Sequence, residues 1–272
     1  MPGGKSYLME NLEEIIRLEI KIDPKVILKQ ARWCGLKPGL RVLDAGCGPG
    51  KVTSILYEMI QPGGTILGID YSEERIKHAE KHYGKRSDIA FQIHDLRDPL
   101  DGKGLFDLIW VRLVLEYNRM EGSDIVRNLT AVLKPGGYLC LLDLDHNSLN
   151  HYELPPRMEE ILFQAIDRVQ EEYNFDPYAG RKLYSYLYDR GYQDIQLDLR
   201  AHNLIYGKIR YEDTFNWMKK GEIAAIKARK LFESYPGGRD AFFLDFKKFL
   251  TDPRRFIYTP LILCKGIKPL SP

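Results

Sequence analysis

The chain has 272 residues, enough for one large domain or for a domain with a sizeable insertion. Its content of 44% hydrophobic and 29% charged residues is typical of a soluble globular protein. A formal net charge of only +2 argues against nucleic acid or a membrane surface as a partner, because neither would be strongly attracted. No apolar run approaches the ~18 residues of a membrane span, and we see no signal-peptide segment at the start.

The cysteines show neither a CxxC pair nor the spacing of metal ligands. They are Cys34, Cys47, Cys140 and Cys264. We interpret them as reduced, mostly buried side chains of a cytoplasmic protein, and we expect no metal site. Monomer and homodimer are equally compatible with the sequence.

Two helices are expected ahead of the first strand. Residues 10–22 carry apolar side chains at helical spacing. Asp23 and Pro24 then have the character of an N-cap and a first helical residue, so a second helix is predicted to run to about Cys34. A turn at residues 35–39 leads into the first strand.

Residues 41–53 are the most informative stretch of the chain. An apolar run ends in Asp44, a glycine-dense turn follows, and a helical pattern begins at about Val52. This order indicates a buried strand, a tight loop and a helix N-terminus, which together form the entrance to many nucleotide sites. Glycine permits positive φ angles and lets a ligand approach the backbone closely. The glycines of this loop are Gly46, Gly48 and Gly50.

Spacing separates the loop chemistries that this stretch could support. A phosphate-binding P-loop requires G-x-x-x-x-G-K-[ST], but the chain has Ala45 at the first glycine position and Val52 after Lys51. The dinucleotide pattern G-x-G-x-x-G requires glycine where Lys51 stands. The remaining pattern is D-x-G-x-G-x-G, whose acid suits a ligand with an α-ammonium group better than a pyrophosphate. An ordinary strand-to-helix turn is the alternative without a ligand.

The pattern D-x-G-x-G-x-G resembles the first motif of the class I S-adenosylmethionine-dependent methyltransferases. The resemblance implies a site for S-adenosylmethionine, with S-adenosylhomocysteine as the product. The residues expected there are Asp44, Gly46, Cys47, Gly48 and Gly50. In such proteins helices ahead of the first strand often pack over the cofactor. Tyr7 and Arg17 are therefore candidates to reach it, the alternative being that both are ordinary surface residues.

A second acid follows at the end of the next predicted strand. Residues 65–70 end in Asp70, about 20 residues past the glycine loop, where a carboxylate can accept hydrogen bonds from both ribose hydroxyls. That geometry is shared with dinucleotide sites, so Asp70 supports a nucleoside without specifying which one. Ser72 is the expected N-cap of a helix to about Tyr83, and Tyr71 is placed to pack against an adenine or in the core.

The third and fourth strands add two more candidates. Residues 89–93 alternate as a strand, and the resemblance implies that Asp95 then binds the adenine amino group while the Leu96 N–H binds a ring nitrogen. Residues 106–111 form a strongly apolar strand that is followed directly by Arg112. A charge in that place needs a partner. We expect Arg112 either near the carboxylate of the cofactor or in a structural ion pair.

A helix over residues 124–133, a turn L-K-P-G-G that the same family shares, and a strand over residues 138–144 complete this part of the chain. The predicted fold class is α/β, a Rossmann-like doubly wound sheet of seven mainly parallel strands with an N-terminal helical segment and helical lid insertions. Ligands of such sheets bind at the carboxyl ends of the strands. The predicted strand ends carry Asp44, Asp70, Asp95 and Arg112.

The pattern changes after the fifth strand. Predicted helices cover residues 151–173, 181–190, 211–234 and 239–250, and predicted strands cover residues 194–199 and 256–264. We expect an insertion at residues 204–250 to cover the acceptor pocket as a lid. The single methyltransferase domain then divides into an N-terminal cover (1–35), a cofactor-binding core (36–145), an acceptor-site cover (146–180 and 204–250) and the end of the sheet (181–203 and 251–269).

Methyl transfer from a sulfonium is an in-line displacement, in which alignment of the reactants can supply about 7–11 kcal/mol. A neutral acceptor also loses a proton, which a histidine or a carboxylate can take. The candidate bases are His146, His151, Glu116 and Asp143. We expect His146 and His151 to face the acceptor, although either could be a solvated loop histidine.

The expected acceptor is a small molecule that is methylated on oxygen, nitrogen or carbon. Base and glutamine N-methyltransferases carry [DN]-P-P-[YF] after the fourth strand, whereas residues 112–115 of this chain read R-L-V-L. The alternative is a non-catalytic S-adenosylmethionine-binding protein that has lost its acceptor site. An NAD-dependent oxidoreductase is more distant, because of Lys51.

Overall fold

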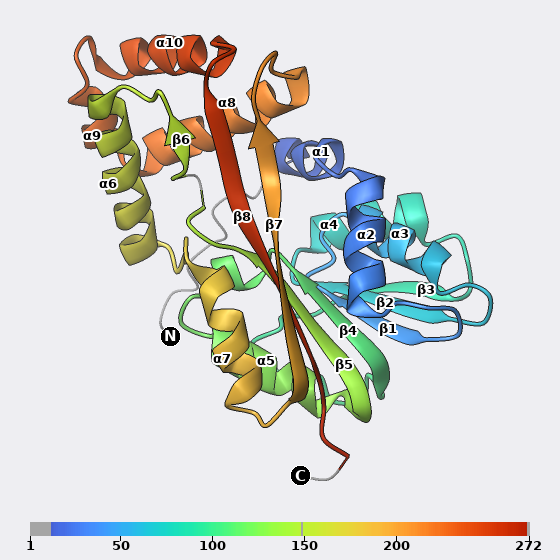
Figure 1. The fold of residues 1–272 in the computed structure, drawn as a ribbon. Helices are drawn as coiled ribbons and strands as arrows, with labels where there is room; N and C mark the ends of the chain where they lie inside the picture. The colour runs from blue at the N-terminus through green and yellow to red at the C-terminus, as the bar shows by residue number, and fades with distance from the viewer. Residues whose placement is uncertain (1–11, 148, 271–272) are drawn as a thin grey trace.

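The computed structural model describes residues 12–147 and 149–270, so the candidate Tyr7 lies outside the described residues. Within them a single eight-stranded sheet runs through the molecule with helices on both faces (Figure 1). The strands are β1 (Arg41–Ala45), β2 (Thr65–Asp70), β3 (Ile89–Ile93), β4 (Phe106–Arg112), β5 (Leu133–Leu144), β6 (His151–Tyr152), β7 (Gln193–Ile205) and β8 (Phe256–Ile267). The helices are α1 (Leu12–Ile20), α2 (Pro24–Cys34), α3 (Lys51–Met59), α4 (Glu73–Tyr83), α5 (Gly122–Ala131), α6 (Pro156–Glu172), α7 (Leu183–Tyr188), α8 (Tyr211–Lys227), α9 (Arg229–Glu233) and α10 (Gly238–Thr251), with 3₁₀ turns η1 (Leu115–Tyr117) and η2 (Ala179–Lys182).

The sheet has the predicted doubly wound, mainly parallel form. Its order is β3-β2-β1-β4-β5-β8-β6, and β7 also pairs with β8. The pairs among the first five strands are parallel, whereas β8 is antiparallel to β5, β6 and β7. The strand order reverses between β1 and β4, which is the switch point where open α/β sheets bind their ligands.

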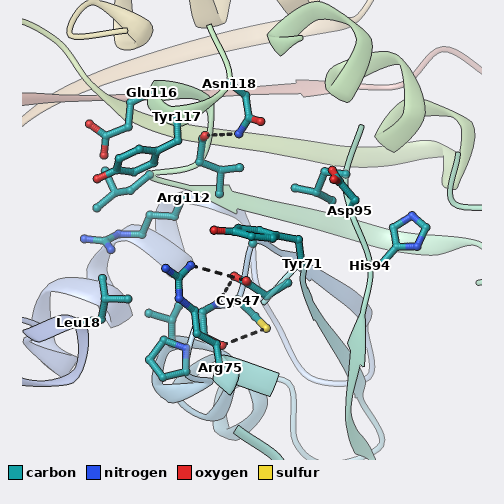
Figure 2. A pocket seen from close by; sticks show the side chains of 18 of the residues that line it. Leu18, Cys47, Tyr71, Arg75, His94, Asp95, Arg112, Glu116, Tyr117 and Asn118 are labelled. Carbon is teal, nitrogen blue, oxygen red and sulfur yellow. Dashed lines mark hydrogen bonds and ion pairs between the residues drawn. The ribbon is translucent and has the colours of Figure 1, made fainter. Parts of the chain in front are cut away.

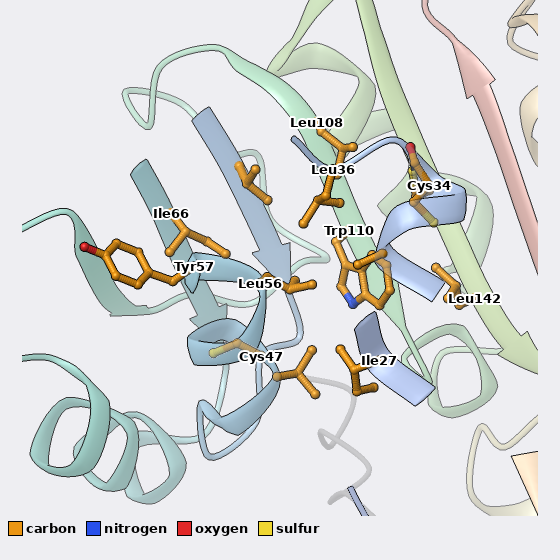
Figure 3. Close-up of a cluster of buried hydrophobic side chains, with 14 of the residues drawn as sticks. Ile27, Cys34, Leu36, Cys47, Leu56, Tyr57, Ile66, Leu108, Trp110 and Leu142 are labelled. Atoms are coloured by element: carbon orange, nitrogen blue, oxygen red, sulfur yellow. Dashed lines mark hydrogen bonds between the residues drawn. The ribbon is translucent and has the colours of Figure 1, made fainter. Parts of the chain in front are cut away.

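Alternate residues of the central strands face opposite sides of the sheet and build two apolar cores. On one side Val42 and Trp110 pack with residues of α2, α3 and α4 (Figure 3). On the other side Leu43 and Ile109 pack with residues of α5 and α7. All four side chains are fully buried. Because both faces are covered, these strands read as continuous apolar runs in the sequence.

The helix and strand on either side of the L-K-P-G-G segment are displaced from their predicted positions. α5 ends at Ala131 instead of Leu133, and β5 already begins at Leu133, which pairs with Phe106. The register then shifts before Tyr138. Residues 134–137 therefore form an irregularity within the strand, where the sequence predicted a turn ahead of it.

The helix that we expected over residues 151–173 begins only at Pro156. His151 and Tyr152 instead form β6, which pairs with the start of β8. A local pattern could not show this, because the partner strand lies far away along the chain. The helix expected over residues 181–190 is likewise divided, into η2 and α7.

The insertion between the last two long strands lengthens their hairpin and then forms helices. β7 continues to Ile205, well past the predicted end at residue 199, and pairs with β8 along its length. We call α6 and α8–α10 the cap. These helices enclose a third apolar core that includes Trp217, Phe232 and Phe242. In Figure 1 the cap sits at one end of the sheet with α1 beside α8.

Two simpler expectations concern the cysteines and the membrane. All four cysteines are free and buried, as predicted. In the part of the chain that the structure describes, no helix combines the length and the apolarity that crossing a membrane requires.

Candidate active site

A cavity of about 290 Å³ opens at the carboxyl ends of β1, β2, β3 and β4. Its wall combines the glycine loop, the residues that follow the next three strands, and the end of α1. Figure 2 shows His94 and Asp95 on one side, Tyr71 between, and Arg112 with Glu116 on the opposite side. We call these sides the Asp95 end and the Arg112 end. The structure thus brings three of the four predicted strand-end residues, Asp70, Asp95 and Arg112, around one cavity.

The course of the glycine loop depends on two positions that lack a side chain. Gly46 has a φ of +79°, and a Cβ there would overlap the Val114 side chain. Gly50 has a φ of +93°, and a Cβ there would lie 2.7 Å from the Ala79 Cβ. A side chain at either position would displace the loop. With glycine in place, residues 46–49 line the cavity.

Asp70 ties this loop to the end of β2. Its Oδ2 accepts a hydrogen bond from the Gly48 N–H at 2.9 Å, and its Oδ1 accepts one from the Ser72 N–H at 3.0 Å. The Arg75 guanidinium lies 3.7 Å from Oδ1. Asp70 lines the cavity and is 5% exposed. A carboxylate oxygen has two lone pairs, so Asp70 keeps the capacity to accept ribose hydroxyls.

Asp44 and Gly50 do not line the cavity, in contrast to their neighbours in the motif. The Asp44 carboxylate is buried and accepts a hydrogen bond from the Thr53 hydroxyl at 2.6 Å. Burial raises the pKa of Asp44 to about 7, although this hydrogen bond and the Arg112 guanidinium oppose the rise. The geometry therefore favours a structural role for Asp44, which joins the end of β1 to α3 on the side of the loop away from the cavity.

The Asp95 end contains a carboxylate that already has a cationic partner. Asp95 accepts hydrogen bonds from the backbone N–H and the guanidinium of Arg97, which hold its pKa below the ordinary value. Leu96 is buried in the wall of the cavity. His94 is a residue that sequence reasoning missed. Its Nε2 is buried and has no hydrogen-bond partner among residues 12–147 and 149–270.

Tyr71 presents an aromatic ring between the two ends. The ring is 40% exposed and lies against the Arg75 guanidinium, 5.8 Å from its carbon atom. Such a partly exposed, stacked ring offers a face to a flat ligand, whereas a core tyrosine would be covered. Of the two alternatives from the sequence, packing in the core does not fit a ring with this exposure. Packing against an adenine stays a prediction.

Charged groups dominate the Arg112 end. The Arg112 Nε donates a hydrogen bond to the Gln30 side chain at 3.1 Å, and burial lowers the pKa of Arg112 to about 10. Glu116 is 2% exposed and accepts a hydrogen bond from Asn147 at 2.7 Å. Burial raises the pKa of Glu116, and the nearby Lys220 and Lys21 ammonium groups oppose that rise.

Asp143, one of the candidate bases, has a structural position. Its Oδ2 accepts hydrogen bonds from the backbone N–H groups of Val114, Leu115 and Glu116, at 2.8–3.2 Å. Its Oδ1 accepts another from the Leu144 N–H at 2.9 Å. The carboxylate thus fixes the turn that carries Glu116 into the cavity.

Neither His146 nor His151 lines this cavity, so their placement beside an acceptor stays a prediction. His146 hydrogen-bonds to Asn150 at 2.8 Å. His151 belongs to β6, and its ring packs edge-on against Trp217 in the cap. Of the three base candidates with histidine or glutamate side chains, Glu116 alone reaches the cavity wall.

Arg17 does not line the cavity either. Its side chain is 3% exposed and donates a hydrogen bond to the Asn216 amide oxygen of α8 at 2.7 Å. The predicted N-terminal cover is thereby joined to the cap. The next turn of the chain contributes Lys21, which sequence reasoning missed, to the wall of the cavity.

A second, smaller cavity of about 100 Å³ lies between α6 and α8 in the cap. Its wall is mostly apolar, with Asn147 and Lys220 as polar members. Tyr117 lines both this cavity and the larger one.

The fold and the cavity together define an α/β protein with a site at the carboxyl ends of its parallel strands. Residues 36–195 match the profile of a family described as "Methyltransferase domain", and this match covers more than half of the chain. The chain therefore belongs to this methyltransferase family, and the predicted class I S-adenosylmethionine-dependent methyltransferase is confirmed at that level.

Curated relatives agree with the family. A demethylmenaquinone methyltransferase of Lactococcus lactis is 30% identical over 128 residues, which are 46% of this chain and 50% of the relative. Juvenile hormone acid O-methyltransferase of Bombyx mori is 28% identical over 196 residues, which are 70% of this chain and 67% of the relative. Alignments to the first relatives span about half to two thirds of their lengths.

A solved structure shows the same fold. The phosphoethanolamine N-methyltransferase 2 of Haemonchus contortus in complex with S-adenosyl-L-methionine matches with a TM-score of 0.54. The match covers 94% of this chain and 56% of that protein, at 17% identity. At this identity the likeness supports the fold and no more.

Proposed function

We propose that this chain transfers a methyl group from S-adenosylmethionine to a small-molecule acceptor by in-line displacement and releases S-adenosylhomocysteine. The observation that carries the proposal is the convergence of Gly48, Asp70, Asp95 and Arg112 on one cavity of a methyltransferase-family fold. These residues end or follow four separate strands, and the sequence predicts each of them as a cofactor contact.

The wall of the cavity fits the parts of S-adenosylmethionine in order. Asp70 has acceptor capacity for ribose hydroxyls, and the ring of Tyr71 offers a face for the adenine. At the Asp95 end, Asp95, the Leu96 N–H and the buried Nε2 of His94 supply polar atoms for the adenine edge. At the opposite end, the Arg112 guanidinium is suited to the carboxylate of the methionine part.

The bound cofactor supplies a methyl group that is activated by attachment to a positively charged sulfur. The residues of this chain have to hold the acceptor in line with that group and exclude water, since alignment is the main source of rate in such a displacement. Glu116 lines the larger cavity and hydrogen-bonds to Asn147 of the second, so it can accept a proton from an acceptor that carries one.

A small-molecule acceptor is supported by the size of the second cavity and by the relatives. A volume of about 100 Å³ suits part of a small molecule. The names of the two curated relatives specify demethylmenaquinone and juvenile hormone acid as acceptors. Both are small organic molecules.

The test is the release of S-adenosylhomocysteine when the full chain is incubated with S-adenosylmethionine and a panel of small metabolites. We expect release with at least one class of acceptor, and at least tenfold less with Asp70→Ala because cofactor affinity falls. Cofactor binding without release for any acceptor would support the alternative of a binding protein. Absence of cofactor binding would overturn the proposal.

A further inference from the structure

The strand β7 forms a long edge of the sheet. Within residues 12–147 and 149–270 it pairs with β8 alone, whereas the other side of β8 pairs with β5 and β6 (Figure 1). β7 has 13 residues, about twice the length of an ordinary strand. The backbone N–H and C=O groups that point away from β8 therefore offer a template to which a further strand can add.

This edge lacks most of the devices that proteins use to block such a template. Lysine, proline and bulges are the common ones. Residues 193–205 contain neither lysine nor proline. Shifts in register interrupt β7 only near its ends, between Gln193 and Gln196 and between Ala201 and Asn203. We call the regular part between the two shifts, residues 196–201, the open segment.

One face of the open segment is apolar and poorly covered. Leu197 and Leu199 are 52% and 68% exposed, and Ala201, the next residue on the same face, is exposed too. Cys264, which lies opposite Leu197 on β8, belongs to the apolar core that α7 covers. The cover ends before the two leucines. Neighbouring exposed apolar side chains of this kind mark an interaction surface.

The opposite face of the open segment carries one acid and one base. The Arg200 Nε donates a hydrogen bond to the Asp198 Oδ2 at 2.6 Å, and both side chains remain partly exposed. The segment reads Q-L-D-L-R-A, so the two charges stand symmetrically on either side of Leu199. A second copy of the same segment can satisfy this arrangement.

The symmetry of the charges selects a single register. In a twofold antiparallel pair, opposite residues lie on the same face of the sheet, so the axis passes through a residue and not between two. An axis at Asp198 or at Arg200 would place identical charges opposite each other. An axis at Leu199 places Asp198 of each copy opposite Arg200 of the other, and Leu197 opposite Ala201. Both faces are then complementary.

We propose that the open segment is a self-association surface, at which a second copy of this chain adds its β7 antiparallel to the first with the twofold axis at Leu199. The sheet then continues from one copy into the other. No residue of β7 lines either of the two cavities described above, so this inference does not depend on the proposed function.

The experiment is sedimentation equilibrium of the full chain over a series of concentrations. We expect the mass to rise from that of one chain toward that of two. Leu199→Lys should weaken association about tenfold or more, because two ammonium groups then face each other at the axis. Leu244→Lys on α10 is the matched control, since that side chain is 58% exposed and far along the chain from β7. Circular dichroism should show the same fold for both variants.

Three outcomes would overturn the inference. The first is the mass of a single chain at every concentration. The second is association that Leu199→Lys leaves unchanged or that both variants weaken equally, because the contact would then lie elsewhere. The third is association that appears only after residues 1–11 are removed, because those residues would then be the occupant of the edge.

An exchange of charges tests the register itself. Asp198→Arg and Arg200→Asp should each weaken self-association about tenfold, since like charges then face each other twice across the axis. An equimolar mixture of the two variants should associate as the unchanged chain does, because every arginine again faces an aspartate. Neither variant retains the Arg200–Asp198 hydrogen bond within one chain, so recovery in the mixture reports contacts between chains. A mixture that stays as weak as its components would contradict the register.

Discussion

The core, residues 36–145, and the cap are built in different ways. The strands of the core are buried on both faces between helices, and they pair with the next strand along the chain except at the switch point, where β1 pairs with β4 (Figure 1). The cap assembles α6 with the later helices α8–α10 around the third apolar core. The larger cavity is lined mainly by the core, whereas the second cavity is lined mainly by the cap.

This difference suggests a division of work between the regions. Under the proposed function, cofactor binding depends on strand ends that the sheet holds in place, while acceptor selection depends on packing between distant helices. Substitutions in the core should then change stability and cofactor affinity, and substitutions in the cap should change acceptor kinetics alone. Four predictions test that division. A cap substitution that lowers cofactor affinity, or a core substitution that changes acceptor kinetics alone, would contradict it.

The largest expected effect is a lower free energy of unfolding when a large side chain is removed from the apolar core around β4. Trp110→Ala removes a fully buried indole from β4, and we expect a loss of about 3–5 kcal/mol in the free energy of unfolding. Urea denaturation followed by circular dichroism measures it. Tyr152→Ala is the control, since that side chain is 62% exposed and should change stability by less than about 0.5 kcal/mol. A loss below about 1 kcal/mol for Trp110→Ala would contradict the described packing.

The second prediction concerns the pH dependence that Asp44 contributes. Its pKa is about 7 in the folded protein and 3.8 as a model value, so the folded state binds the extra proton between those pH values. The contribution of this proton to the free energy of unfolding is complete below pH ~4 and is lost as pH rises through ~7. The total loss is at most about 4 kcal/mol. Asp44→Asn should flatten this fall in urea midpoints between pH 4 and 8. An unchanged profile would show that Asp44 ionises normally.

The third prediction compares two glycines with similar positive φ angles. Gly46→Ala should weaken S-adenosylmethionine binding about 100-fold, because the new Cβ is strained and overlaps Val114 beside the cavity. Gly39→Ala carries the same backbone strain, but a Cβ there meets nothing within 4 Å. Its cofactor affinity should stay within about twofold. Calorimetric titration of both variants decides whether the loop geometry matters to the ligand.

The smallest expected effect belongs to the cap. Ile166→Ala enlarges the wall of the second cavity and should lower kcat/KM for an apolar acceptor about tenfold, with cofactor affinity unchanged. Ile226→Ala on α8 is the control, since that side chain is 67% exposed and lies outside the cavity. Steady-state kinetics and calorimetry on the same samples separate the two readouts. A parallel loss of cofactor affinity in Ile166→Ala would contradict the proposed division between core and cap.

The sequence predicted the core well because its signals are local. The ends of β2 and β3 placed Asp70 and Asp95 at one edge of the sheet, and Ser72 was correctly identified as an N-cap whose side chain accepts from the Arg75 N–H. Each of these inferences needs only a few neighbouring residues.

The cap and the Arg112 end could not be predicted in the same way. The Arg17–Asn216 hydrogen bond joins α1 to α8 of the cap, although the two residues lie 199 positions apart in the sequence. His151 was assigned to a helix because its strand partner in β8 lies outside any local window. Asp44 matched its motif, yet its burial behind the loop depends on Thr53 and the sheet.

The central claim is that the cavity at the strand ends binds S-adenosylmethionine. Calorimetric titration of the full chain with S-adenosylmethionine, S-adenosylhomocysteine and NAD tests it most directly. We predict binding of the first two at about one equivalent, no binding of NAD, and clearly weaker binding of both ligands to Asp70→Ala. Binding of NAD alone, or equal titrations for the unchanged chain and Asp70→Ala, would contradict the account.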